Sequence, residues 1–169
     1  ISKALTKLTA DGAMFVGDVR NHALQEAFHL SVLAHDDPDT IASFDQSTLT
    51  ALVTERCAED KELTIGPEYF RSLPRRHPAL SHVAVHLKRT HADNEMTRFR
   101  FDAVLYRQRQ ILPVSRPDWH FAQGLISDVD DIGEWLRSRP SSEICGLRGI
   151  TNSRISVWAG ALNAVPAEV

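Results

Sequence analysis

Four polar residues that could transfer protons or orient a substrate stand where predicted strands begin or end. Asp18 follows the apolar run 13–17, while His91, Asn94 and Glu95 surround a polar turn between two later strands. Two carboxylates, an imidazole and an amide at one place would suit general acid–base catalysis or the orientation of an amine. We therefore take Asp18, His91 and Glu95 as candidate catalytic residues, with Glu95 as the candidate general base.

The case for Glu95 rests on its expected surroundings. It is predicted to open a strand whose same-face neighbours are apolar, namely Phe99, Phe101 and Leu105. Partial desolvation at the mouth of such a face favours the protonated carboxyl and would suit proton exchange near neutrality. If Glu95 instead lies on the surface and pairs only with a neighbouring arginine, its role is structural.

Three side chains are candidates for binding a substrate: Asn94, Arg20 and Arg98. Plainer structural alternatives stand beside these predictions. Asp18 could serve only as a helix cap, and a tight turn favours Asn94 and His91 for backbone reasons. The strand that contains residue 98 could present no more than a solvated ladder of alternating charges: Arg98, Arg100 and Asp102.

Three predicted strands would position these residues. Residues 13–17 form a short continuous apolar run, typical of a parallel strand buried on both faces. Residues 82–88 alternate with period two, and residues 95–106 form a long strand close enough to pair with them as an antiparallel hairpin. Ligands bind beyond the carboxyl ends of parallel strands in an open sheet. The ends of the first two strands and the beginning of the third are therefore expected at one edge.

Helices are predicted around these strands over residues 2–9, 21–33, 41–63, 67–73, 128–137 and 152–162. Within residues 41–63 the helix is expected to begin near Asp45 or Ser47. Residues 143–150 form a last short strand. The chain is thus predicted to be an α/β protein that forms a single domain over residues 1–169, long enough to bury its own core.

Composition narrows the classes of function. The 169 residues are 43% hydrophobic and 24% charged, which is typical of a globular domain, and the formal net charge of −3 argues against a nucleic-acid-binding protein. No apolar run approaches the length of a membrane span, and Cys57 and Cys145 are expected to be reduced. No cysteine or carboxylate completes a tetrahedral metal site with the clustered histidines, so none is predicted there: His77, His82, His86 and His91.

Three motifs, taken together, are similar to one protein family. Residues 15–21 read Phe-Val-Gly-Asp-Val-Arg-Asn, residues 94–105 read Asn-Glu-Met-Thr-Arg-Phe-Arg-Phe-Asp-Ala-Val-Leu, and residues 147–154 read Leu-Arg-Gly-Ile-Thr-Asn-Ser-Arg. They resemble the carboxyl-terminal half of the S-adenosylmethionine-dependent methyltransferase domains embedded in nonribosomal peptide synthetases and hybrid polyketide synthases. Residues 61–63, with Pro67 and Phe70, resemble the helical region that lies between these motifs in the family.

This resemblance implies a partial class I, Rossmann-like methyltransferase fold whose last strand is inserted antiparallel. The cofactor would be S-adenosylmethionine, bound mainly by a half that precedes residue 1. The chain has no Gly-x-Gly turn, so no cofactor-binding residue is predicted within it. The acceptor would be an aminoacyl, peptidyl or ketide group tethered to a phosphopantetheinyl carrier protein. Neighbouring synthetase domains would be further partners, in the cytoplasm. By analogy, Asp18, His91, Asn94 and Glu95 would line the acceptor pocket.

The chain departs from the family pattern at several positions. Phe99 and Phe101 stand where tyrosine is usual, and Thr151 stands where proline is usual. Two alternatives therefore stay open: an epimerase of tethered amino acids with His91 and Glu95 as its acid–base pair, and a non-catalytic scaffold. A half-sheet cut along the strand at 13–17 would also expose an apolar edge, so self-association is expected.

Overall fold

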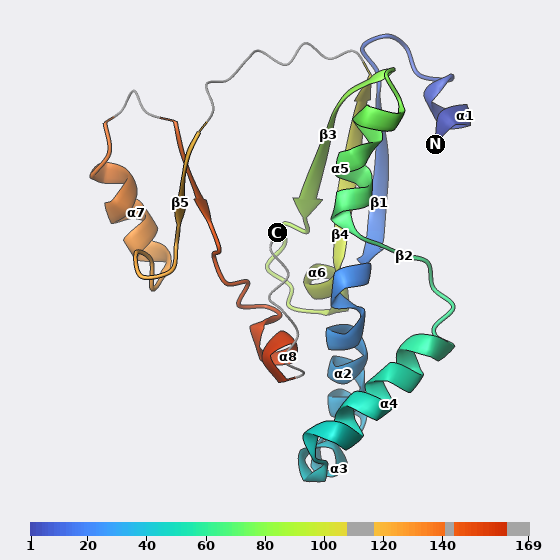
Figure 1. The fold of residues 1–169 in the computed structure, drawn as a ribbon, viewed down its shortest axis with the longest axis vertical. Coiled ribbons are helices and arrows are strands. Elements are labelled where there is room, and N and C mark those ends of the chain that lie inside the picture. The colour runs from blue at the N-terminus through green and yellow to red at the C-terminus, as the bar shows by residue number, and fades with distance from the viewer. Residues whose placement is uncertain (108–116, 141–143, 162–169) are drawn as a thin grey trace. The chain divides into compact units, whose positions relative to one another are not determined.

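The computed structural model describes residues 1–107, 117–140 and 144–161. The chain divides into two compact units, which we describe separately (Figure 1): a main unit of Ile1–Gln110 with Ser153–Ala167, and a small unit of Ile111–Asn152 with Glu168–Val169. Among the described residues, no helix combines the length and the apolar character that crossing a membrane requires.

A four-stranded mixed sheet organises the main unit. The strands are β1 (Ala13–Asn21), β2 (Thr64–Ile65), β3 (Leu80–Leu87) and β4 (Arg100–Arg107), in the spatial order β2-β1-β4-β3. β2 runs parallel to β1, whereas β4 runs antiparallel to both of its neighbours, β1 and β3. The predicted antiparallel pairing of the second and third strands is confirmed, and β1 and β3 point in the same direction on either side of β4 (Figure 1).

The third strand begins five residues later than predicted. Residues 95–99 form a short helix instead, α6 (Glu95–Phe99), with Asn94 as its N-cap. The Asn94 side chain accepts a hydrogen bond from the Thr97 N–H at 3.3 Å, and the Thr97 hydroxyl accepts one from the Asn94 N–H at 3.1 Å. This capping box satisfies backbone groups locally, so it prevails over the alternating pattern that favoured a strand.

One face of the sheet forms the main core. Phe101, Ala103 and Leu105 alternate along β4 and are all buried, as the period-two pattern predicts. The Phe101 ring meets Phe70 of α5 (Pro67–Arg76) edge to face, with 5.7 Å between the ring centroids. The buried residues of this core are Leu5, Val19, Phe70, Leu73, Leu80, Val83, Phe101, Ala103 and Leu105.

β1 is not buried on both faces, and that prediction is wrong. Phe15 is paired with Val104 of β4, so its side chain lies on the sheet face opposite the main core, where it is 66% exposed. β2 pairs with β1 only at Arg20 and Asn21. Within the described part of the chain, no strand pairs with the outer edge of β1 between residues 13 and 19.

The remaining helices of the main unit are α1 (Ser2–Leu5), the 3-10 turn η1 (His22–Leu24), α2 (Gln25–Asp36), α3 (Pro38–Ser43), α4 (Gln46–Glu59) and α8 (Ser156–Ala161). α4 begins after the N-cap Asp45, as predicted. A second core of Leu24, Ala27, Phe99 and Ile155 joins α2 to α6 and to the residue preceding α8. Position 162, the predicted end of the last helix, lies outside the described residues.

The small unit contains two parallel strands and one helix. β5 (Asp118–Phe121) pairs with β6 (Cys145–Arg148), and α7 (Val129–Arg137) lies between them in sequence, as predicted for residues 128–137. Gly146 permits a close approach, because a Cβ atom there would lie 2.6 Å from the Trp119 ring. The predicted last strand is confirmed over residues 145–148, and its predicted start at 143 lies outside the described residues.

Candidate functional site

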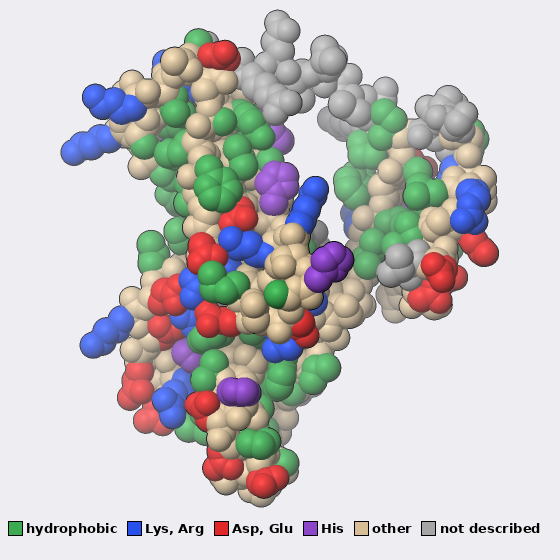
Figure 2. All heavy atoms as spheres, turned by 180° about the vertical axis from the view of Figure 1, so that it is seen from behind, with side chains coloured by type: hydrophobic (Ala, Val, Ile, Leu, Met, Phe, Trp, Pro, Cys, Tyr) green, Lys and Arg blue, Asp and Glu red, His purple; other side chains and the backbone are tan. Residues whose placement is uncertain are grey.

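The two parallel strands of the main unit end beside the beginning of β4. Arg20 of β1 is paired with Arg100, the first residue of β4, and Leu87 of β3 is paired with Phe101. Residues that follow or end β1 and β3 therefore share one edge of the sheet with α6. Charged side chains of both signs gather in the middle of the face that Figure 2 shows.

Asp18 lies at an irregularity of β1. The β1–β4 register shifts between Val16 and Val19, and Asp18 adopts a backbone φ of 65°, in the left-handed region. Its N–H donates a hydrogen bond to Oδ1 of Asp102 at 2.9 Å, and its Oδ1 lies 3.1 Å from Nζ of Lys88. The Asp18 side chain is nevertheless 44% exposed. The irregularity thus presents this carboxylate to solvent at the edge of the sheet.

Arg100 joins the acidic residues of this edge. Its guanidinium donates to Glu62 at 2.6 Å and to Glu95 at 2.8 Å, and it also donates to the Asp18 carbonyl oxygen at 3.3 Å. The side chain is only 15% exposed, so these bonds are partly shielded from water. Asp18 and Glu95, which the sequence predicted to converge, are brought together through this one arginine.

Arg20 has a structural position rather than the predicted substrate contact. Its side chain is 4% exposed, and its guanidinium lies 3.0 Å from Oδ2 of Asp60 and 2.7 Å from Oε2 of Glu62. The same guanidinium stacks on the Phe28 ring at 3.6 Å. A side chain enclosed in this way holds the loop after α4 against β1 and has no surface left for a substrate.

Asp60 receives further support from two neighbours. The Glu62 N–H donates to its Oδ1 at 2.9 Å, and His29 Nε2 lies 3.0 Å from its Oδ2. The Glu62 N–H bond is the main cause that lowers the pKa of Asp60, and Arg20 and His29 add to it against the opposing effect of burial. Asp60 is therefore held in its charged form as a fixed part of the edge.

Lys88 and Asp102 complete the cluster on the side of β3 and β4. Their side chains pair at 2.6 Å between Nζ and Oδ1. This hydrogen bond raises the pKa of Lys88. Burial raises the pKa of Asp102, but the bonds from Lys88 and from the Asp18 N–H outweigh it, so the pKa is lowered overall. Both groups stay charged across the neutral range.

The environment predicted for Glu95 is wrong. Glu95 is the first residue of α6 rather than of a strand, and its side chain is 44% exposed. Among the described residues, the Glu95 carboxylate accepts hydrogen bonds from Arg100. Without an apolar strand face around it, the physical argument for Glu95 as a general base no longer applies. Asp18 is the carboxylate of this edge with the more unusual local geometry.

The other three predicted residues lie at the same end of the sheet with separate roles. Asn94 caps α6. The Arg98 guanidinium donates two hydrogen bonds to the Asp93 carboxylate, at 2.7 and 2.8 Å. His91 is exposed, and the described part of the chain shows no hydrogen bond or ion pair of its ring. The structure therefore does not bring His91 into contact with Asp18 or Glu95.

We call the joined charges the edge cluster: Asp18, Arg20, Asp60, Glu62, Lys88, Glu95, Arg100 and Asp102. It contains five carboxylates and three basic groups. Arg20, Asp60 and Arg100 are the most enclosed members, at 4%, 10% and 15% exposed. Asp18, Glu62 and Glu95 are 44%, 39% and 44% exposed. The outward side of the cluster is consequently acidic, which favours a positively charged group such as an ammonium ion.

Several members of the edge cluster were missed by sequence reasoning. The sequence pattern indicates at most a charge ladder for Asp102 and Arg100, and it gives no signal for Asp60, Glu62 or Lys88. Alternation on β4 could have placed Asp102 next to Arg100, because residues two apart share a sheet face. The ion pairs of Asp60 and Glu62 with β1 had no such signal, since they join segments about 40 residues apart.

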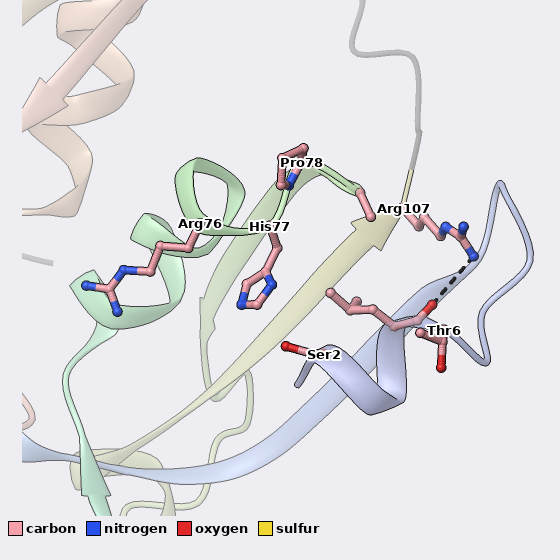
Figure 3. Close-up of a pocket in the computed structure, with 8 residues that line it drawn as sticks. Ser2, Thr6, Arg76, His77, Pro78 and Arg107 are labelled. Atoms are coloured by element: carbon pink, nitrogen blue, oxygen red, sulfur yellow. Dashed lines mark hydrogen bonds between the residues drawn. The ribbon is translucent and has the colours of Figure 1, made fainter.

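A pocket of about 210 Å³ lies at the other end of the sheet, around Arg107, the last residue of β4 (Figure 3). Leu5, His77 and Pro78 contribute to its lining. Arg107 donates hydrogen bonds to the carbonyl oxygens of Leu5 and Leu8. No residue predicted for the site lines this pocket, so we do not assign the chemistry to it.

Comparison with known proteins places this chain among synthetases. It is 35% identical over 162 residues to chondramide synthase of Chondromyces crocatus, covering 92% of this chain and 4% of that protein. It is 39% identical over 106 residues, 63% of this chain and 1% of the relative, to the probable non-canonical nonribosomal peptide synthetase CymA of Salinispora arenicola. It is 30% identical over 141 residues, 79% of this chain and 4% of the relative, to the beauvericin nonribosomal cyclodepsipeptide synthetase of Beauveria bassiana.

The chain is homologous to segments of nonribosomal peptide synthetases. It spans about 4% or less of the length of these three relatives. No family model matches it. The part of the predicted resemblance that concerns nonribosomal peptide synthetases is thereby confirmed, together with the mixed α/β architecture.

Proposed function

We propose that this chain is the acceptor-side part of an S-adenosylmethionine-dependent methyltransferase domain within a nonribosomal peptide synthetase. The acceptor is an aminoacyl, peptidyl or ketide group tethered to a carrier protein, and we favour an amine because the outward side of the edge cluster is acidic. The observation that carries the proposal is the insertion of antiparallel β4 between β1 and β3. This arrangement supports the fold expected from the family and places Asp18 and Glu95 at one edge.

The only feature of the described residues that would favour the cofactor is the negative charge on the outward side of the edge cluster. The acidic outward side of the edge cluster is compatible with a sulfonium cation nearby, but the chain has no glycine-rich turn for an adenosyl group. We therefore assign no residue of this chain to adenosyl binding. When bound, the cofactor would supply the methyl group.

In the proposed mechanism the chain binds and deprotonates the acceptor amine. Glu95, held by two bonds from Arg100, has a structural role and adds negative charge to this edge without taking part in proton transfer. The acceptor nitrogen reacts as the neutral amine, and Asp18 takes the one proton that it releases as it gains the methyl group. The electron pair of the broken carbon–sulfur bond would stay on the sulfur of the cofactor. Arg100 also holds the Asp18 carbonyl, so it keeps both groups at one edge.

The test is an assay of the full synthetase that contains this chain. Its carrier protein is loaded with the aminoacyl group, and mass spectrometry measures the gain of a methyl group after addition of S-adenosylmethionine. We expect methylation by the unaltered synthetase and a loss of roughly 10²–10⁴ in turnover for Asp18→Asn. Lys7→Met serves as a control, because Lys7 is exposed and lies between Leu5 and Leu8, which bond to Arg107 at the end of β4 away from the edge cluster.

The same assay separates the other functions. Deuterium exchange at the α-carbon without methyl gain would overturn the proposal in favour of an epimerase. Neither reaction would indicate a scaffold. We do not propose the epimerase, because the described structure shows no contact between His91 and Glu95, the pair it would require. The carrier protein belongs to the proposal and is tested by the same assay. A cytoplasmic location is proposed as well, and fractionation of cells that express the full synthetase would test it.

A further inference from the structure

Asp18 has a backbone conformation that few non-glycine residues adopt. Among the described residues it is the one non-glycine position with a positive φ, at 65°. The Cβ atom of an L-residue makes this conformation unfavourable, and glycine would adopt it freely. Such positions persist when surrounding contacts determine them, and they are concentrated at functional sites.

Two side chains supply these contacts, one from β4, which pairs with β1, and one from the residue that follows β3. Oδ1 of Asp102 accepts the Asp18 N–H at 2.9 Å, which fixes the backbone of the irregularity in β1. Nζ of Lys88 lies 3.1 Å from the Asp18 carboxylate and 2.6 Å from Oδ1 of Asp102. The main chain and the side chain of Asp18 are therefore held by the same ion pair.

The ion pair itself is more enclosed than the residue it holds. Lys88 is 21% exposed and Asp102 is 20% exposed, whereas Asp18 is 44% exposed. Asp18 thus presents an exposed carboxylate from a backbone that Asp102 and a lysine shared between two carboxylates hold in place. An exposed carboxylate on a fixed backbone is the arrangement expected for a group that must meet a ligand in one geometry.

We propose that Lys88 and Asp102 are positioning residues that hold the Asp18 carboxylate in the geometry required for the reaction. This inference rests on the proposed function. It adds two residues that the sequence motifs did not indicate as functional. Lys88 and Asp102 act through Asp18 and do not themselves touch the acceptor.

The geometric part is tested on the 169-residue chain by amide hydrogen exchange. Asp102→Ala removes the acceptor of the Asp18 N–H, so we expect exchange at Asp18 to accelerate about tenfold or more. The amides of Ala103 and Leu105, which belong to the β4 ladders, should keep their protection. Unchanged exchange at Asp18 would overturn the inference. Asp102→Asn is the control, because its side chain keeps an oxygen that can accept the Asp18 N–H. In this variant the Asp18 amide should keep more of its protection than in Asp102→Ala.

The catalytic part is tested by turnover in the full synthetase. Lys88→Met should lower kcat about tenfold to a hundredfold and leave KM for the loaded carrier within about threefold, because orientation rather than binding is lost. Lys88→Arg should restore part of kcat, since it restores the positive charge. Lys7→Met makes the same chemical change far from Asp18 and should leave kcat unaltered.

The failures of the two proposals are distinguishable. An unaltered synthetase that transfers no methyl group would overturn the proposed function, and the exchange at Asp18 would then decide the positioning role alone. A synthetase that methylates normally with Lys88→Met would overturn the positioning role and leave the proposed function standing. A fall in kcat without rescue by Lys88→Arg would also count against positioning through charge.

Discussion

Asp18 combines a left-handed backbone conformation with an exposed carboxylate. Its positive φ predicts that Asp18→Gly and Asp18→Ala differ in stability although both remove the carboxylate. We expect the alanine variant to be less stable by about 1 kcal/mol, because the left-handed conformation costs an L-residue more than glycine gains in the unfolded chain. Urea unfolding of the two variants measures this difference. Equal stabilities would show that position 18 relaxes to an ordinary conformation.

Asp60 and Asp102 make the stability of the chain depend on pH. Their pKa values are lower in the folded chain than in the unfolded chain. The unfolded chain therefore binds more protons below about pH 4, and the free energy of unfolding should fall as the pH decreases through that range. The contribution is fully present above that pH. Urea unfolding between pH 3 and 6 measures it, and Asp102→Asn should make the dependence shallower; an unchanged slope would contradict the ion pair with Lys88.

At the scale of elements, the role of Asn94 follows from its position as the N-cap of α6. The capping box gives Asn94 a structural role, whereas the sequence predicted that it binds the substrate. We expect Asn94→Ala to lower the free energy of unfolding by about 1 kcal/mol, because a cap is lost, and Asn94→Asp to preserve stability. Thermal unfolding of both variants measures this. If Asn94→Asp keeps stability but abolishes turnover in the full synthetase, Asn94 contacts the substrate as well.

At the scale of the whole molecule, β1 leaves an open edge. Phe15 is 66% exposed, and within the described residues no strand pairs with that edge from residue 13 to 19. We expect the chain to self-associate with increasing concentration, because unpaired backbone groups beside apolar side chains favour strand pairing. Sedimentation equilibrium measures the association, and Phe15→Lys should weaken it. A monomer at high concentration with β1 ordered would contradict this expectation.

The binding of S-adenosylmethionine is a second property of the whole chain. We expect weak or undetectable binding to residues 1–169, because the chain has no glycine-rich turn to hold the adenosyl group. Isothermal titration calorimetry on the chain alone measures it. Micromolar affinity would contradict the interpretation that the cofactor is bound mainly outside this chain.

The sequence by itself determined the features that depend on local pattern. Alternation predicted that Phe101, Ala103 and Leu105 share the core face of β4. A proline at the first turn predicted α5, and helical spacing predicted α7. The motifs predicted similarity to nonribosomal peptide synthetases, which the relatives confirm. These inferences succeed because neighbouring residues in one element share a face whatever the rest of the fold does.

Only the tertiary structure decided the composition of the edge cluster. Residues 95–99 form a helix because the Asn94–Thr97 capping box outweighs their alternating pattern, and this moved Glu95 out of an apolar setting. Arg20 is enclosed because Asp60 and Glu62 reach it from a loop about 40 residues away. Contacts between segments so far apart depend on strand order and chain direction, and no local spacing in the sequence encodes them.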